Sequence, residues 1–208
     1  MFFQKKMLLW LLLLVLAGFG FVAIKFLMQK KGGDNGPKQQ ALPIKQHTDI
    51  FNTSVANALG AYFDMKAAFV EADTGKAKEA CRRMLVLVDS IKLDELRKDT
   101  SGIFSTDSLM LENVRANAQS LLTQTNITEM RKDFSMVNEN LYPFLKGINY
   151  KGPDMYWQNC PMAFGEGKEA NWISNTKEIV NPYLGKNDPE FKGGMLHCGE
   201  IKDSIKAQ

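Results

Sequence analysis

Hydrophobic residues follow two distinct patterns along this chain, and the first is a continuous run. Met7 to Ile24 is apolar without interruption, and two lysines precede it. A run of this length predicts a membrane-spanning helix, because a helix satisfies its own backbone groups in lipid. We therefore expect residues 1–31 to form an N-terminal membrane anchor and residues 32–46 to form a flexible linker rich in Gly, Pro and Gln. A cleaved export signal is the alternative, although its apolar region is usually shorter.

The second pattern is a set of four amphipathic segments between residues 47 and 149. Apolar residues recur in them every three or four positions, which is the spacing of one helical face. Four such stripes, joined mostly by short loops, bury one another most economically as an up-down four-helix bundle, so the fold class is predicted to be mainly α. The stripes are Phe51, Val55, Ala58, Leu59, Tyr62 and Phe69; Ala77, Ala80, Cys81, Met84, Val88 and Ile91; Leu111, Val114, Ala118, Leu121 and Leu122; and Ile127, Met130, Phe134, Val137, Leu141, Phe144 and Ile148.

Capping residues indicate where these helices begin and end. Thr48 predicts the start of a helix that runs to about residue 72, and residues 73–75 predict a short turn before a second helix. Residues 105–107 suggest the cap of the third helix. Asn126, with a glutamate three positions later, resembles a capping box at the start of the fourth. Pro143 is expected to kink or end this last helix locally.

Helical periodicity stops at about residue 150. Residues 150–208 are rich in Gly, Pro, Asn and aromatic residues, which is not the composition of a linker. Aromatic side chains such as Tyr156, Trp157 and Trp172 can offset the entropy of ordering this segment by packing on the bundle. We expect an ordered, loop-rich C-terminal cap, with short strands at most.

The charge distribution narrows the choice of compartment and partner. The whole chain has a formal charge of +3, but residues 1–31 contain five lysines and no acidic residue, which leaves 21 basic and 23 acidic groups in the remainder. A mildly acidic domain argues against nucleic acid as the main partner. Because only two lysines precede the apolar run, we expect an anchor in the inner membrane with the soluble domain in the periplasm. A cleaved signal would also place this domain outside the cytoplasm.

The cap holds two thiols, and each has soft donor atoms nearby in the sequence. Cys160 is followed two positions later by Met162, and Met195, His197 and Cys198 lie within four residues of one another. If the two groups converge, they offer two thiolates, two thioethers and an imidazole. Such soft ligands favour Cu(I) and Ag(I) over Mg²⁺, Ca²⁺ or Mn²⁺. Zinc would accept the thiolates and the imidazole but gains little from methionine.

Another interpretation of the same thiols stays open. In an exported protein, two cysteines in a loop-rich cap often form a structural disulfide, here Cys160–Cys198. The spacing is not that of a thioredoxin-type redox motif, and the Cys-x-x-Cys-His motif of covalently attached haem is absent, so we expect no haem. No acid–base or nucleophilic constellation is visible, so we do not expect an enzyme.

Several elements of the cap together resemble a known pattern. They are Tyr156-Trp-x-x-Cys160-Pro-Met-Ala163, Asn171-Trp-Ile-Ser174, Glu178-Ile179, Asn181-Pro-Tyr-x-Gly185 and Met195-x-x-Cys198-Gly199. This set is similar to that of a domain of unknown function common in Bacteroidetes. That domain occurs alone behind an export signal, or is appended to membrane-fusion adaptor subunits (HlyD/CusB-like proteins) of copper and silver efflux systems. The resemblance covers roughly residues 45–200.

The resemblance implies an extracytoplasmic domain that handles heavy metals. By motif position it makes Cys160, Met162, Met195 and Cys198 metal ligands, whereas His197 lies outside the pattern and its role stays open. The chain lacks the hairpin and lipoyl region of an adaptor, so it is similar to the stand-alone form. The expected function is therefore binding of Cu(I) or Ag(I) for sequestration or for hand-over to an efflux adaptor. The rival expectation is a structural or interaction module of the cell envelope with the Cys160–Cys198 disulfide.

Overall fold

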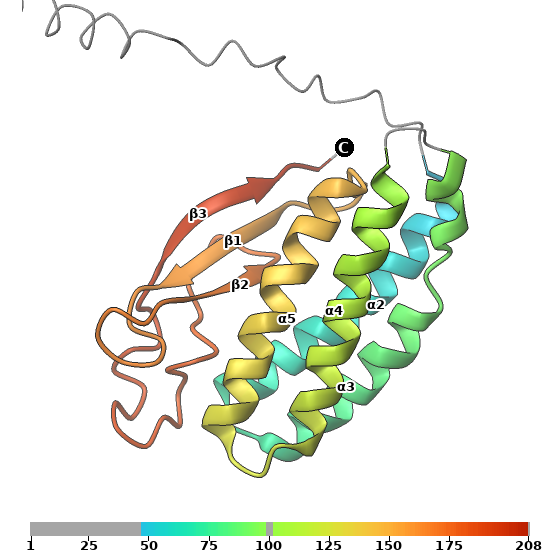
Figure 1. The fold of residues 1–208 in the computed structure, drawn as a ribbon. Coiled ribbons are helices and arrows are strands. Elements are labelled where there is room, and N and C mark those ends of the chain that lie inside the picture. The colour runs from blue at the N-terminus through green and yellow to red at the C-terminus, as the bar shows by residue number, and fades with distance from the viewer. Residues whose placement is uncertain (1–46, 99–101, 208) are drawn as a thin grey trace, which may run out of the picture. The chain divides into compact units, whose positions relative to one another are not determined.

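The computed structural model describes residues 47–98 and 102–207 (Figure 1). The predicted anchor at residues 1–31 and the linker at residues 32–46 lie outside the described residues. Within the described ranges, no helix is both long enough and apolar enough to cross a membrane. These ranges belong to one compact unit that begins at Pro43.

The described part of the chain is mainly helical, as the hydrophobic pattern predicts, and it also carries one small sheet. The α-helices are α2 (Asp49–Val70), α3 (Thr74–Asp89), α4 (Ile103–Thr123) and α5 (Ile127–Gly147). Helix α2 packs along α3, α3 contacts α4, and α4 packs along α5. The rings of Tyr62 and Phe69 on α2 lie 5.6 and 4.9 Å from the ring of Phe134 on α5. Helix α5 therefore also contacts α2. We call these four helices the helical bundle.

Two of the expected helix caps are confirmed, because side chains bond to free backbone N–H groups. The hydroxyl of Thr48 accepts a hydrogen bond from the N–H of Phe51 at 3.2 Å. The side-chain oxygen of Asn126 accepts one from the N–H of Glu129 at 2.9 Å. Each bond satisfies a donor in the first turn that has no partner within the helix.

Other predicted boundaries are wrong for local reasons. The turn lies at residues 71–73 and not at 73–75, because α2 ends at Val70 and Asp73, which accepts from the N–H of Lys76, starts α3 at the next residue. Residues 105–107 lie inside α4, which starts after Gly102, a residue in the left-handed conformation (φ +82°) with no side-chain cap. A 3₁₀ helix, η1 (Leu93–Lys98), precedes that start and was not foreseen. Helix α5 does not end at Pro143 but continues to Gly147.

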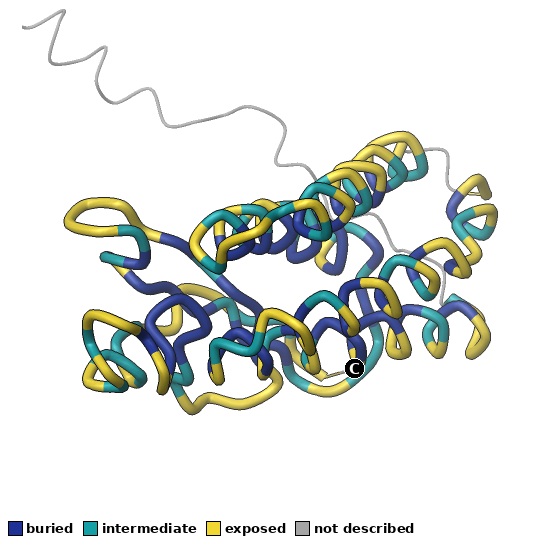
Figure 2. The backbone as a smooth tube through the Cα atoms, turned by 90° about the horizontal axis from the view of Figure 1, so that it is seen from below, coloured by how far each residue is buried: buried dark blue, intermediate teal, exposed yellow. Residues whose placement is uncertain are grey.

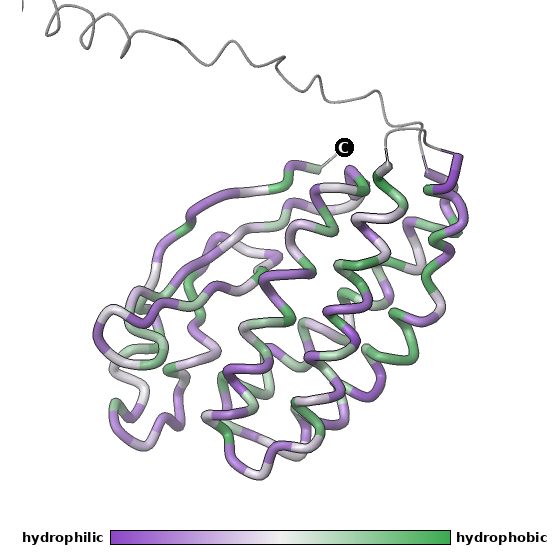
Figure 3. The backbone as a smooth tube through the Cα atoms, in the orientation of Figure 1, coloured by the Kyte–Doolittle hydropathy of each residue, from purple (hydrophilic) through white to green (hydrophobic). Residues whose placement is uncertain are grey.

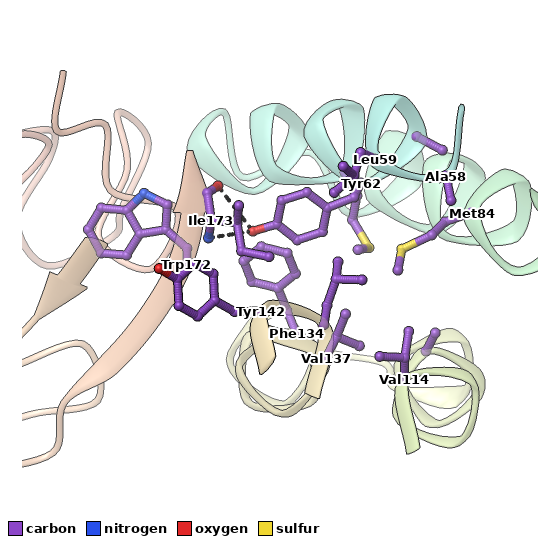
Figure 4. Packing of buried hydrophobic residues seen from close by; sticks show 14 of the residues in the cluster. Ala58, Leu59, Tyr62, Met84, Val114, Phe134, Val137, Tyr142, Trp172 and Ile173 are labelled. Atoms are coloured by element: carbon purple, nitrogen blue, oxygen red, sulfur yellow. Dashed lines mark hydrogen bonds between the residues drawn. The ribbon is translucent and has the colours of Figure 1, made fainter. Parts of the chain in front are cut away.

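The core lies along the apolar stripes. In Figure 2 the helix faces that point toward one another are buried and the outer faces are exposed, and Figure 3 shows the matching alternation of hydropathy along each helix. Figure 4 shows Leu59, Met84, Val114 and Val137, one from each of the four helices, converging in this core. Cys81 is buried there too, and its thiol donates to the carbonyl of a neighbouring helix at 3.3 Å.

The C-terminal cap contains a three-stranded antiparallel sheet where loops with short strands were expected. Its strands are β1 (Met155–Cys160), β2 (Ala170–Ser174) and β3 (Glu200–Ile205), in the order β2-β1-β3. Strand β1 is therefore central, and a bulge interrupts its pairing with β3 between Trp157 and Gln158. The sheet brings two distant segments of the cap together along β1.

The sheet lies between the helical bundle and the segment of residues 175–199. On one face, the Trp157 ring stacks on that of Tyr142 in α5, with centroids 4.5 Å apart. The neighbouring residue Gln158 points to the opposite face, because side chains alternate along a strand. There its amide donates to the carbonyls of Thr176 and Glu178 at 3.0 Å. Figure 4 shows the same alternation on β2, where Ile173 points toward the bundle and Trp172 away from it.

Tyrosine hydroxyls from outside the sheet cover the free edge of β2. The N–H of Ile173 donates to the hydroxyl of Tyr62 at 2.9 Å (Figure 4), and this hydroxyl donates to Asn138 on α5 at 2.6 Å. The hydroxyl of Tyr183 donates to the carbonyl of Asn171. An exposed strand edge offers unpaired groups to other chains, so these bonds both fix the sheet on the bundle and protect its edge.

Candidate functional site

The structure brings Cys160 and Cys198 together. Cys160 is the last residue of β1, Cys198 precedes β3, and their Sγ atoms lie 3.8 Å apart. A disulfide requires about 2.0 Å, so at this separation the cysteines are two thiols. Two sulfur ligands of a tetrahedral zinc ion, each at about 2.3 Å, are about 3.8 Å apart, so both sulfur atoms are close enough to reach one ion. The spacing therefore suits two thiolates that bind one ion.

A glycine allows this close approach. Gly199 follows Cys198, and the next residue, Glu200, pairs with Asn159 on β1. A Cβ at Gly199 would lie 2.5 Å from the carbonyl oxygen of Asn159 and 3.0 Å from the ring of Trp172. The backbone of Gly199 has φ +149°, which non-glycine residues rarely adopt. No other residue type fits here without moving the chain, so Gly199 sets how closely Cys198 approaches β1.

Asn181 holds the Cys198 turn through two of its polar groups, and its third fixes its own turn. Its side-chain amide donates to the carbonyl of Cys198 at 3.0 Å, and its backbone N–H donates to the carbonyl of Leu196 at 2.8 Å. Its side-chain oxygen accepts from the N–H groups of Tyr183 and Leu184 at 2.8 and 3.0 Å. Asn181 is fully buried. Such a set of bonds fixes the backbone on which the thiol stands.

A buried ion pair attaches the same segment to the bundle. The guanidinium of Arg131 on α5 lies 3.4 Å from the carboxylate of Asp188, and the two side chains are only 6% and 7% exposed. Arg131 also donates to the carbonyls of Pro182 and Phe69, at 3.1 and 3.2 Å. Burial lowers the pKa of Arg131, and Asp188 opposes that shift. Removing either partner would leave a buried charge without compensation, so the pair fixes this segment against α2 and α5.

The two thiols differ in exposure. The side chain of Cys160 is fully buried, whereas Cys198 is only partly buried. Burial, and next the neighbouring Cys160, raise the pKa of the Cys198 thiol. A metal ion that binds here must displace this proton, because the thiolate is the ligand.

The other predicted ligands are Met162, Met195 and His197, and each has contacts of its own. Met162 and Met195 are partly buried and pack against the hydrophobic core. The backbone carbonyl of Met195 accepts from the N–H of Cys198 at 3.0 Å, so the two share one turn. His197 is exposed, and its Nδ1 lies 2.7 Å from the carbonyl oxygen of Ile179. Over residues 47–98 and 102–207, no three His, Cys, Asp or Glu side chains form a group that could hold an ion.

Sequence reasoning found the thiols but not the residues that position them. Asn181, Arg131 and Gly199 carry no metal-binding chemistry of their own, so the search for donor atoms gave them no role. A signal was present for two of them, since Asn181 and Gly199 belong to the short elements of the cap that carry the family resemblance. The sequence carries no such signal for Arg131, because a single arginine among the polar residues of a helix is common.

Comparison with known proteins gives one family. The family described as "Protein of unknown function (DUF3347)" matches residues 58–151. The match begins within α2 and ends after α5, before the strand that carries Cys160. It agrees with the coarse part of the resemblance, a domain of unknown function, over the helical bundle. No curated protein and no solved structure gives a significant match.

Proposed function

We propose that this protein binds a soft monovalent metal ion, Cu(I) or Ag(I), between Cys160 and Cys198. The observation that carries the proposal is the 3.8 Å separation of the two Sγ atoms, from residues 38 positions apart in the sequence. Thiolates select Cu(I) over harder cations. Zinc sites usually need four ligands, or three and a water, and the described residues offer no group of three among His, Cys, Asp and Glu.

The ion is the cargo of the protein in this proposal, not a resident cofactor of an enzyme. Residues 1–31 would anchor the up-down four-helix bundle and its cap to the inner membrane, with both in the periplasm. The protein would sequester the ion or hand it over to a heavy-metal efflux adaptor, without catalytic turnover. Met162 and Met195 would add weaker thioether contacts. His197, the other predicted ligand, forms no group of three with the two cysteines and would have to leave its contact with Ile179 to join them. These assignments rest on the apolar run at Met7 to Ile24 and on the resemblance of the cap.

An anaerobic Cu(I) titration of the full-length chain against a competing chelator tests the proposal. The wild type should take up one Cu(I), and Cys160→Ser and Cys198→Ser should each lose this binding. Cys81→Ser is the matched control, because Cys81 is buried between helices and its replacement hydroxyl still donates to the carbonyl of Ala118. Unchanged Cu(I) affinity in both cap variants would reject the proposal.

The alternative is a structural or interaction module of the envelope in which the two cysteines form a disulfide. The same proximity supports it, since the two sulfur atoms need to move about 1.8 Å closer to reach the roughly 2.0 Å of a disulfide bond. Protein purified from the envelope without reductant distinguishes the two functions. A stable Cys160–Cys198 bridge, present in every molecule and unaffected by Cu(I), would favour the structural module.

A further inference from the structure

We infer that Cys198 is the site at which low-molecular-weight disulfides react with this protein, and that Cys160 resolves the resulting mixed disulfide. The pair then has an oxidised state that releases the ion. The reaction itself needs only the two thiols; the effect on the ion rests on the proposed function. The inference comes from the unequal exposure of two thiols that lie within reach of each other.

Exposure decides which thiol reacts first. A disulfide exchanges only with a thiolate that its sulfur can reach in line. Cys198 is partly exposed in the turn that begins at Met195, whereas the side chain of Cys160 is fully buried at the end of β1. An external disulfide therefore meets Cys198 first. Cys81, inside the helical bundle, is also fully buried and has no second cysteine beside it among the described residues.

Proximity decides the second step of the reaction. The Cys198 thiolate attacks one sulfur of the small disulfide, its S–S bond breaks, and one small thiolate leaves. The Cys160 thiolate, 3.8 Å away, then attacks the Cys198 sulfur and expels the second small thiolate. The cysteine pair is oxidised by two electrons, the small disulfide is reduced to two thiols, and the two protein protons pass to them. Closing the bond needs a sulfur shift of about 1.8 Å, which rotation of the two cysteine side chains must supply.

The oxidised pair holds no ion, because neither sulfur is then a thiolate. Conversely, an ion shared by both sulfurs occupies the lone pairs that would attack a disulfide. The two states exclude each other, so the balance between thiols and disulfides in the compartment sets how much of the protein is able to bind Cu(I).

The test uses the reduced full-length chain in mild detergent and glutathione disulfide as the probe. Samples are acid-quenched, alkylated and analysed by mass spectrometry. Wild type should lose two hydrogens and carry no glutathione, Cys160→Ser should retain one glutathione on Cys198, and Cys198→Ser should remain unmodified. Cys81 reports folding in every sample, because it should be alkylated only after denaturation. Modification of Cys198→Ser at the rate of Cys160→Ser would overturn the proposed order, and wild type that retains glutathione would overturn the resolving step.

A second arm separates this inference from the proposed function. Wild type is loaded with one equivalent of Cu(I) before glutathione disulfide is added, and loading should abolish the exchange. If exchange proceeds as described but Cu(I) does not affect it, the exchange stands and the shared-ion site fails. If Cu(I) binds through both cysteines but glutathione disulfide never oxidises them, the site stands and this inference fails.

Discussion

The substitution Gly199→Ala tests whether one backbone position sets the distance between the two thiols. Its added methyl group would lie 2.5 Å from the carbonyl oxygen of Asn159, on the strand that carries Cys160. Ordinary carbon–oxygen contacts are no closer than about 3.3 Å, so the chain must retreat by about 0.8 Å. Because Cys198 is the adjacent residue, the retreat increases the separation of the sulfur atoms.

The energetic cost has two parts. A non-glycine residue in a sparsely populated backbone region with positive φ costs about 1–3 kcal/mol. Overpacking against a rigid neighbour adds about 1–3 kcal/mol. We therefore expect a loss of about 2–6 kcal/mol in the free energy of unfolding, together with weaker Cu(I) binding.

Gly165→Ala is the matched control. Gly165 also has positive φ, at +108°, but no heavy atom lies within 4 Å of the Cβ it would carry. It should show the backbone penalty without any effect on the thiols. Urea unfolding followed by circular dichroism gives the stability of both variants. A trivalent arsenoxide, which binds only adjacent thiols, reports the cysteine pair without assuming any metal function.

The reasoning is refuted if Gly199→Ala binds the arsenoxide and Cu(I) as wild type does. It is also refuted if the two variants lose equal stability, because the contact with Asn159 would then contribute nothing. Loss of arsenoxide binding in Gly165→Ala as well would show that the cap unfolds generally rather than at Gly199.

Three further predictions concern the bundle and its junction with the sheet. Burial raises the pKa of Asp107 to about 7, so its carboxyl destabilises the folded state increasingly as pH rises from about 4 to about 7. In this range the free energy of unfolding should fall by about 1.4 kcal/mol per pH unit, and Asp107→Asn should remove this slope in urea unfolding at several pH values. Tyr62→Phe should cost about 2 kcal/mol in the same assay, because the buried N–H of Ile173 loses its acceptor. Gly60→Ala should raise the melting temperature by adding about 1 kcal/mol, since Gly60 is exposed in the interior of α2 with nothing near its Cβ. An unchanged pH slope, an unchanged stability or a lower melting temperature, respectively, would contradict them.

The helices were predictable because their signals are local. The stripes and the caps at Thr48 and Asn126 act within three or four residues, and the structure confirms them. The start of α4 was missed because Gly102 begins it through its backbone conformation, without the side-chain cap that sequence patterns reveal. Pro143 lies within α5 and does not end it, since the helix continues to Gly147.

The sheet was not predictable for two opposite reasons. Strand β1 is covered on both faces, by α5 and by residues 175–199, so its sequence lacks the alternation of apolar and polar residues that marks a strand. Strand β3 is largely exposed, and its only apolar residues are Ile201 and Ile205. The donor atoms of the candidate site were visible in the sequence. Their meeting was not, because it depends on the pairing of β1 with β3, about 40 residues apart.

The position of β3 beside β1 also determines when the candidate site appears during synthesis. A ribosome makes the chain from its N-terminus, so the four helices and strands β1 and β2 are synthesised before residue 200 is added. Cys198 reaches its place only as β3 joins the central strand. A nascent chain therefore holds Cys160 at this spot without its partner until β3 joins the sheet, and the paired-thiol chemistry begins only then.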